Sequence, residues 1–397
     1  MDLLPKSEAI ARVRRMQAWM NDSAVDTLFI LQNADQYYLS GTVQVGLFCL
    51  PVESDPVYLV QKSVSRARME SAWERIVPLA GLSKTMDVLS AEGFHRPQRI
   101  GLEMDVLPTS FYLRFKQLFP DVQFVDASGA IRKTRMTKSA YEIAQMRGAA
   151  RMLSRAFDEI PGWARAGVTE LEVSAQLEAF LRLQGHQGIT RMRGFNHEIA
   201  YGTVSSGASA SYPTCFPGPV GFIGLYPAIL NGPSLRKLEA GNSLMVDIVG
   251  GSGGYIVDKT RTFSVEELDK EMYAAHEFVL SLNTDIEAML RPGVTCSSIY
   301  RFSLDRVKDS RYAATFMGVG DSRVRFVGHG VGLELDEWPV LSPNSDAALE
   351  PGMTIAVEPK IFFPERGGVG IENTYLITEG GFEKLTPYCE EIIRVPP

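Results

Sequence analysis

The chain has 397 residues, of which 45% are hydrophobic and 22% are charged. This composition is typical of a globular protein with substantial cores, and the length predicts two or three domains, or one small domain joined to a large one. The formal net charge of −7 argues against nucleic acid as a partner, because phosphate binding needs a basic face.

Several features of the sequence bear on its location. No apolar run reaches the roughly 18–20 residues that span a bilayer. The charged, amphipathic start at 1–16 lacks the apolar core of a secretory signal. The cysteines lie far apart without a CxxC pair, at Cys49, Cys215, Cys296 and Cys389. We interpret them as reduced thiols, with a single disulfide as the alternative. The sequence therefore predicts a soluble, cytoplasmic protein that does not contact the membrane.

Helical and strand patterns alternate in the first third of the chain. The segments that carry them are 7–21, 25–31, 46–52, 56–60, 99–104, 110–119 and 122–127. A long helix then starts at about Lys138. We therefore predict a smaller N-terminal α/β domain over residues 1–135 and a second domain over 136–397, with the boundary near 131–136.

A faint internal repeat marks the second domain. Residues 164–182 resemble residues 290–308; each segment follows a long helix and begins near Gly-Val-Thr. Thr169 and Glu172 form a capping-box pattern, and Gly185 can end the helix that they start. Duplication would give a pseudo-twofold domain with a cleft between its halves. The alternative is that Gly-Val-Thr is merely a common way to start a helix.

Two aspartates stand out in residues 243–263, where two apolar strands flank the glycine-rich segment GGSGG. A hairpin symmetric about Ser252–Gly253 would pair Asp247 with Asp258, with Cβ atoms about 4.5–5.5 Å apart. Carboxylates so placed repel and are costly to desolvate, so a divalent cation between them is expected. On the alternative solvated face, the apolar Met245 and Val249 would also be exposed, which fits poorly.

Two glutamates and a histidine add to this set. Glu358 and Glu372 lie symmetrically about Glu365 within residues 354–378, so they can converge, although Pro359 makes a regular pairing less certain. His329 stands between glycines, which lets the backbone approach a site closely. A lone histidine is more often structural, but four inward carboxylates favour a ligand.

The order of these residues resembles the pita-bread metallopeptidase family, in its aminopeptidase P, prolidase and creatinase-like branch. The matching motifs are Asp-x10-Asp, GHGxG, PGMTIAVEP around Glu358 and IEN around Glu372. The resemblance covers 136 to the end closely and the N-terminal domain more loosely. It implies a pita-bread α+β catalytic domain with a duplicated α/β cleft.

The resemblance also implies a mechanism. Asp247 would bind one ion, Asp258 and Glu372 would bridge two, and His329 with Glu358 would complete the other. Such ligands suit two divalent ions of Mn, Fe or Co, with Zn as a further option. The expected reaction is amide hydrolysis by a metal-bridging hydroxide, with Glu358 as the catalytic proton shuttle. Relatives in this branch are commonly homodimers.

Three departures from the family pattern affect substrate handling. Relatives of the Xaa-Pro-cleaving type usually have a histidine about seventeen residues before the first aspartate, where this chain has Leu230 by spacing or Thr214 by motif. They usually have a second histidine at the position of Asp336 and often an arginine at that of Gly370. The ligand set is thus complete while the residues around it differ.

Other residues could compensate for these departures. His197 could replace the missing imidazole as a catalytic residue, and Asp336 could hold a substrate amine; the alternatives are a packing histidine and an exposed acid. Arg191 or Arg193 could bind a substrate carboxylate, or both could be solvated. The stretch 215–232, rich in Pro, Gly and aromatic residues, could line the cleft, pack on a second subunit or be a plain excursion.

The leading hypothesis is a metal-dependent Xaa-Pro aminopeptidase or dipeptidase acting on small peptides. One alternative keeps the metals but assigns a small non-peptide compound to a hydrolase or lyase. The other is a non-catalytic binding scaffold, which the complete ligand set disfavours.

Overall fold

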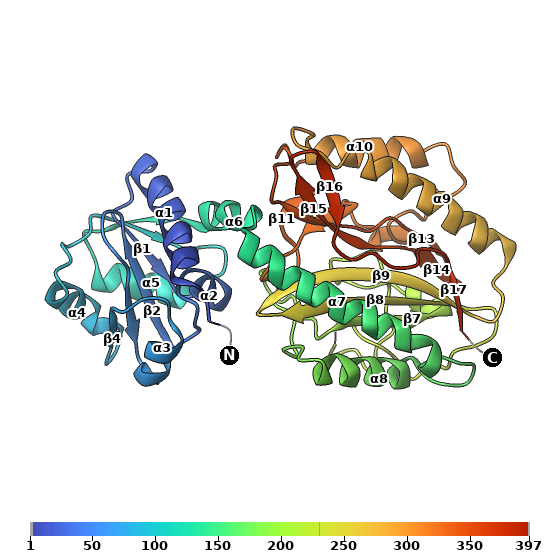
Figure 1. Cartoon of the computed structure of the whole chain (residues 1–397), viewed down its shortest axis with the longest axis horizontal. Helices are drawn as coiled ribbons and strands as arrows, with labels where there is room; N and C mark the ends of the chain where they lie inside the picture. Colours follow the sequence, from blue (N-terminus) through green and yellow to red (C-terminus); the bar gives the residue numbers. More distant parts are fainter. Residues whose placement is uncertain (1–2, 230, 396–397) are drawn as a thin grey trace. The chain divides into compact units, whose positions relative to one another are not determined.

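The computed structural model describes residues 3–229 and 231–395 and shows a mixed α/β chain, as expected. The chain divides into two compact units, Met1–Arg135 and Met136–Pro397 (Figure 1). Among the described residues, no helix is both long and apolar enough to cross a membrane.

The N-terminal unit is an α/β domain built on one six-stranded sheet. Its strands are β1 (Thr27–Ile30), β2 (Gly46–Pro51), β3 (Val57–Val60), β4 (Ile76–Pro78), β5 (Arg99–Leu102) and β6 (Gln123–Asp126). Its helices are α1 (Lys6–Asp22), α2 (Asn33–Ser40), α3 (Val64–Glu70), α4 (Thr85–Ala91), α5 (Thr109–Leu118) and α6 (Ser128–Met136), which ends at the unit boundary. The strand order is β4-β3-β2-β1-β5-β6.

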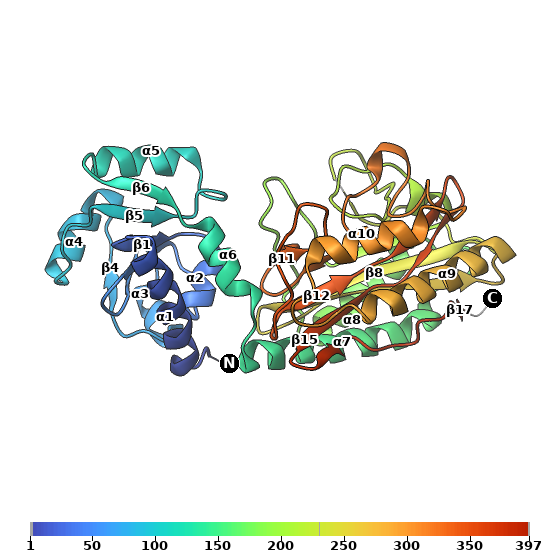
Figure 2. The same cartoon turned by 90° about the horizontal axis from the view of Figure 1, so that it is seen from above.

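Both faces of this sheet are covered. Figure 2 shows α1 and α5 on opposite sides of the strands. Phe115 of α5 packs against Phe29 of β1 in a core that also contains Ile100 and Leu102. On α1, Val13 and Met16 are buried at helical spacing. The apolar runs of the central strands are therefore buried on both sides, as near-continuous apolar strands require.

The second unit contains two similar halves. Its helices are α7 (Ala140–Trp163), α8 (Glu170–Leu183), α9 (Lys270–Glu287) and α10 (Cys296–Val307). Its strands are β7 (Gly202–Ser206), β8 (Ser243–Ser252), β9 (Tyr255–Val265), β10 (Gly328–Gly330), β11 (Glu337–Val340), β12 (Thr354–Val357), β13 (Lys360–Phe363), β14 (Gly367–Gly370), β15 (Asn373–Thr378), β16 (Gly381–Lys384) and β17 (Ile393–Val395).

Each half has two helices followed by three antiparallel strands. The helices α7 and α8 precede the strands β7, β8 and β9, whereas α9 and α10 precede β10, β12 and β15. The helices of the two halves lie on different sides of the strands in Figure 1. Thr169 and Thr295 are the N-cap residues of α8 and α10. The repeated Gly-Val-Thr segments thus occupy equivalent places, as the duplication hypothesis expects.

Local signals in the sequence set the ends of these helices. Thr169 and Glu172 form the expected capping box at the start of α8, because each side chain bonds the other's backbone N–H. Gly185 follows the last turn of α8 with φ +99°, a left-handed conformation that suits glycine.

The register of the β8–β9 hairpin differs from the prediction by two residues. Ser252 pairs with Tyr255, so Asp247 lies opposite Thr260 and Asp258 lies opposite Val249. The turn residues are Gly253 and Gly254, which both have positive φ. The direct Asp247–Asp258 pairing was therefore wrong. The aspartates still share one face, because side chains alternate with a period of two.

The C-terminal strands have the predicted symmetry. Phe363 pairs with Gly367 at the turn end of β13–β14, and Val357 pairs with Asn373 further along. Glu358 and Glu372 thus lie opposite each other at the break between the two strand pairings. The break coincides with Pro359, which cannot donate a ladder hydrogen bond.

The close approach of β7 to β8 near Asp247 provides a test of the fold. Gly202 has φ +135°, and a Cβ atom there would lie 2.1 Å from the Asp247 carbonyl oxygen. We expect Gly202→Ala to lower the free energy of unfolding by roughly 2–4 kcal/mol through strain and overlap, measured by urea unfolding. Gly162→Ala in α7 is the control, because no atom of a described residue lies within 4 Å of the Cβ that it would add. Equal stability of the two variants would contradict the observed approach.

Candidate metal centre

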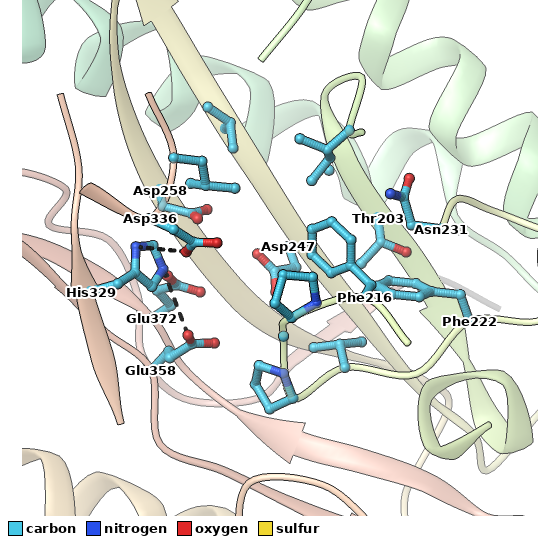
Figure 3. Close-up of a pocket in the computed structure, with 18 residues that line it drawn as sticks. Thr203, Phe216, Phe222, Asn231, Asp247, Asp258, His329, Asp336, Glu358 and Glu372 are labelled. Carbon is cyan, nitrogen blue, oxygen red and sulfur yellow. Dashed lines mark ion pairs between the residues drawn. The ribbon is translucent and has the colours of Figure 1, made fainter. Parts of the chain in front are cut away.

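The structure brings the five predicted metal ligands together in one cavity of the second unit (Figure 3). They are Asp247 on β8, Asp258 on β9, His329 on β10, Glu358 after β12 and Glu372 before β15. Several hydrogen bonds hold β9 against the C-terminal strands; among them, Glu372 N donates to Thr260 O, and Asp258 N donates to Thr374 Oγ1. Ligands from both halves of the unit therefore meet.

These residues form two groups with metal-ligand spacing. Asp258, His329 and Glu372 form the first group, and Asp247, Glu358 and Glu372 form the second. Within each group, one ligand atom per residue lies within 4.8 Å of the others. Glu372 belongs to both groups, so it has the position of a carboxylate shared between two cations.

Burial dominates the electrostatics of these carboxyl groups. It raises the pKa of Asp258 well above its ordinary value, and neighbouring Glu372 and Asp247 raise it further. Burial also raises the pKa of Asp247, and it raises that of Glu358 to about 8 despite the nearby Lys360 ammonium. The protein's own cations thus do not neutralise the cluster, which favours binding of a further cation.

The first group fits a divalent cation. Glu372 Oε1 is buried and has no hydrogen-bond partner among the residues that the structure describes, although such atoms normally find one. His329 Nε2 lies 3.7 Å from Glu372 Oε1 and 3.7 Å from Glu358 Oε1, too far for a hydrogen bond. Two ligands each about 2.1 Å from one ion lie about 3.2–3.6 Å apart. The spacing therefore leaves room for an ion.

Asp336 orients the histidine of this group. Its Oδ1 lies 3.4 Å from His329 Nδ1, which is also 3.1 Å from the Gly330 carbonyl oxygen. The ring is held on this side, so Nε2 faces Glu358 and Glu372 (Figure 3). A carboxylate behind a histidine in this way typically fixes its tautomer and increases its basicity as a ligand.

The second group already contains a cation, which sequence reasoning missed. The Lys360 ammonium bonds Asp247, Glu358 and Glu372 simultaneously. The ammonium therefore lies among the three carboxylates of this group. The signal that could have found it is a lysine opening the buried apolar strand β13, two residues after Glu358.

The loop between β7 and β8 supplies one wall of the cavity, so part of the stretch 215–232 lines the cleft. The lining residues from this loop are Phe216, Pro217, Gly218, Pro219, Val220, Phe222 and Asn231 (Figure 3). Phe222 and Val220 also pack against Met245 and Phe362 in a small core. Leu230 lies outside the described residues.

The remaining candidates for substrate handling differ in their positions. Asp336 lines the cavity, but among the described residues the wall includes neither Thr214 nor His197. His197 is half-buried and close enough to Asp336 to oppose the rise in the pKa of that carboxyl group, which burial causes. Arg193 Nη1 lies 3.6 Å from Glu334 Oε2. Only Asp336 of these residues therefore stands beside the ligands.

Comparison with known proteins supports this description. The model of metallopeptidase family M24 matches residues 144–379, and that of the creatinase/prolidase N-terminal domain matches residues 12–137. The chain belongs to metallopeptidase family M24. The fold class is accordingly the expected N-terminal domain followed by the pita-bread domain of the family.

Full-length relatives of this M24 chain have similar sequences and folds. The Xaa-Pro dipeptidase of Pyrococcus furiosus is 26% identical over 384 residues, covering 96% of this chain and 99% of the relative. That of Pyrococcus horikoshii is 27% identical, covering 96% and 98%. The solved structure of an Xaa-Pro dipeptidase from Bacillus anthracis superposes with a TM-score of 0.82 at 27% identity, covering 97% of this chain and 99% of that chain.

The contact between Asp336 and His329 predicts an effect on metal affinity. We expect Asp336→Asn to weaken Mn²⁺ binding roughly 10–100-fold, because the imidazole loses its anionic partner. Asparagine tolerates the φ of +60° at this position, so the backbone should be unaffected. Calorimetric titration provides the measurement. Asp305→Asn on the exposed face of α10 makes the same charge change and should leave the affinity unaltered.

Metal binding should also depend on pH. Burial lowers the pKa of His329, but Asp336, Glu372 and Glu358 together raise it well above its ordinary value. Because an ion requires deprotonated ligands, protons compete with it more strongly at low pH. We expect Mn²⁺ affinity to increase from about pH 6 to about pH 8, with proton release measurable by calorimetry in buffers of different ionisation enthalpy. A flat profile would contradict these raised pKa values.

Proposed function

We propose that the chain is a metal-dependent peptidase that hydrolyses small peptides at Xaa-Pro bonds, as an aminopeptidase or a dipeptidase. The observation that carries the proposal is the buried group Asp258, His329 and Glu372, with space for an ion and a carboxylate oxygen that no described residue bonds. The relatives named Xaa-Pro dipeptidase, similar over nearly their whole length, support the substrate class.

The chain's own groups suit hydrolysis without a covalent intermediate. A bound divalent ion supplies polarisation of an amide carbonyl and activation of a water molecule. Glu358 lines the cavity, and with an ion bound its carboxylate would be placed to accept a proton from water and to deliver it to the leaving nitrogen. Asp336 keeps the His329 ring in place as the charge develops.

The cavity wall favours a small substrate with an apolar part. Phe216, Val220 and Phe222 face the ligands across the cavity, as Figure 3 shows for the two phenylalanines. Thr203 and Asn231 add polar groups on the same side. An apolar wall with a few polar atoms is the usual character of a small-molecule site, and it suits a proline ring beside a peptide bond.

The competing functions have less support. The full-length relatives named as peptidases favour peptide hydrolysis over reaction with a non-peptide compound. The complete ligand set disfavours a non-catalytic scaffold. The roles of His197 and Asp336 in contacting substrate remain proposals, and Asp336 has the stronger case because it lines the cavity.

We also propose which metal the protein binds, that it is located in the cytoplasm and that it forms a homodimer. Carboxylates with one imidazole suit Mn, Co or Fe, with Zn as an alternative. All four cysteines are unpaired, and Cys215 and Cys389 are exposed, which is compatible with a reducing cytoplasm. The expectation of a homodimer rests on the family resemblance alone.

Turnover of Xaa-Pro peptides tests the proposed function. Chelator-treated protein should lose at least about a hundredfold in kcat/KM on Xaa-Pro dipeptides or Xaa-Pro-Yaa tripeptides, and Mn²⁺ or Co²⁺ should restore it. His329→Ala should show a similar loss because a ligand is missing. Metal-loaded protein that is inactive across a broad panel would exclude the proposal, and metabolite screening would then test the non-peptide alternative.

A further inference from the structure

The buried side chain of Lys360 has surroundings that the family assignment does not explain. Lys360 is the first residue of β13, and its side chain is fully buried. Its Nζ lies 2.5 Å from Glu358 Oε2, 2.9 Å from Glu372 Oε2 and 3.2 Å from Asp247 Oδ2. An ammonium group has three N–H donors and no acceptor. Each donor therefore has one carboxylate oxygen to bond.

The strand opposite leaves space for this side chain. Lys360 pairs with Gly370 across β13 and β14. A Cβ atom at position 370 would lie 2.5 Å from Lys360 Cγ and 2.9 Å from Lys360 Cα. Any side chain at Gly370 would therefore collide with the lysine. The Pro359 carbonyl oxygen, 2.8 Å from the same Cβ position, excludes a side chain as well, and the glycine leaves room for the Lys360 side chain to pass.

The ammonium occupies one of the two possible cation positions. Asp247, Glu358 and Glu372 are the three residues of the second ligand group. An ion bound to all three would have to lie about 2.1 Å from each oxygen, at nearly the point that Nζ already occupies. Two positive charges cannot share that position, because they would repel at contact distance. Occupation by the lysine and by a metal ion is therefore mutually exclusive.

The other cation position remains available. The two oxygens of Glu372 have different surroundings. Oε2 accepts hydrogen bonds from Lys360 and Thr260, whereas the buried Oε1 has no hydrogen-bond partner within the described parts of the chain. Oε1 faces His329 Nε2 at 3.7 Å, in the group that Asp258 completes. Glu372 can thus bridge an ammonium on one side and a metal ion on the other.

We propose that Lys360 is a permanent replacement for one of two metal ions, so that the chain binds a single divalent ion at Asp258, His329 and Glu372. The charges agree with this assignment. The four acidic ligands carry a charge of −4, and Lys360 with one divalent ion supplies +3. With a second divalent ion, the net charge of the ligands, Lys360 and the two ions would be +1. That ion would also have to displace a buried, fully bonded ammonium. The inference rests on metal binding and not on the identity of the substrate.

Metal stoichiometry tests this proposal directly. Chelator-treated full-length protein is saturated with Mn²⁺, freed of excess metal, and assayed by elemental analysis and by electron paramagnetic resonance. Wild-type protein should hold one ion per chain with the spectrum of an isolated Mn²⁺. Lys360→Ala should hold two ions per chain, with the spectrum of an exchange-coupled pair, because the second group is then vacant.

Two further variants serve as controls. Lys360→Arg keeps the positive charge and should still hold a single ion. Lys259→Met removes another buried lysine, whose ammonium lies over the rings of Phe157 and Tyr388 and not among the site carboxylates, and should also hold a single ion. If Lys360→Ala does not fold, Lys360→Gln provides the same test with a side chain of similar length.

The outcomes separate this proposal from the proposed function. Two ions in wild-type protein, or a single ion in both uncharged Lys360 variants, would overturn the replacement of a metal by lysine even if Xaa-Pro peptides are cleaved. Protein that binds no ion at all would also overturn it. Conversely, one ion per chain with no turnover of Xaa-Pro peptides would contradict the peptidase assignment and leave the role of Lys360 supported.

Discussion

The burial of negative charge is the physical constraint on which the second unit depends. Carboxylates from β8, β9 and the segments after β12 and before β15 are all at least largely buried in one cavity. Like charges in such a place repel, and burial raises the pKa values of three of them. Glu372 is the exception: burial opposes its ionisation, but Lys360 and His329 together hold its pKa at about 2. The cations and the acids therefore determine each other's positions, and the two halves of the unit are joined through them.

Side-chain alternation explains why much of this site could be predicted from the sequence. The predicted register of the β8–β9 hairpin differed from the observed one by two residues. Asp247 and Asp258 were still correctly placed on one face, because a shift of two residues preserves the alternation of side chains. The symmetry about Glu365 likewise placed Glu358 opposite Glu372 despite the interruption at Pro359. Periodicity in the strands thus carries the information about which ligands converge, and this information tolerates an error in the turn.

The parts that the sequence did not predict depend on contacts between distant segments. Lys360 sits in an apolar strand, but only the register with Gly370 and the convergence of three acids show that its ammonium is buried and paired. Gly370 was recognised as a departure from the family, whereas the lysine that lies opposite it was not noticed. His197 is a similar case. Its position relative to the cavity depends on the conformation of a loop, which the periodicity of a sequence cannot predict.

A lysine and a metal ion neutralise charge in different ways, and the difference limits what this centre can do. An ammonium with three bonded carboxylates has no donor left for a substrate oxygen, whereas an ion with an open position can accept one. Lys360 can therefore fix Glu358 and Glu372 but cannot polarise a carbonyl itself. Polarisation must come from the side of the cavity where His329, Asp258 and Glu372 Oε1 meet, next to Asp336. Under the proposed assignment, the substrate's reacting group would lie on that side, facing the aromatic wall of the loop after β7.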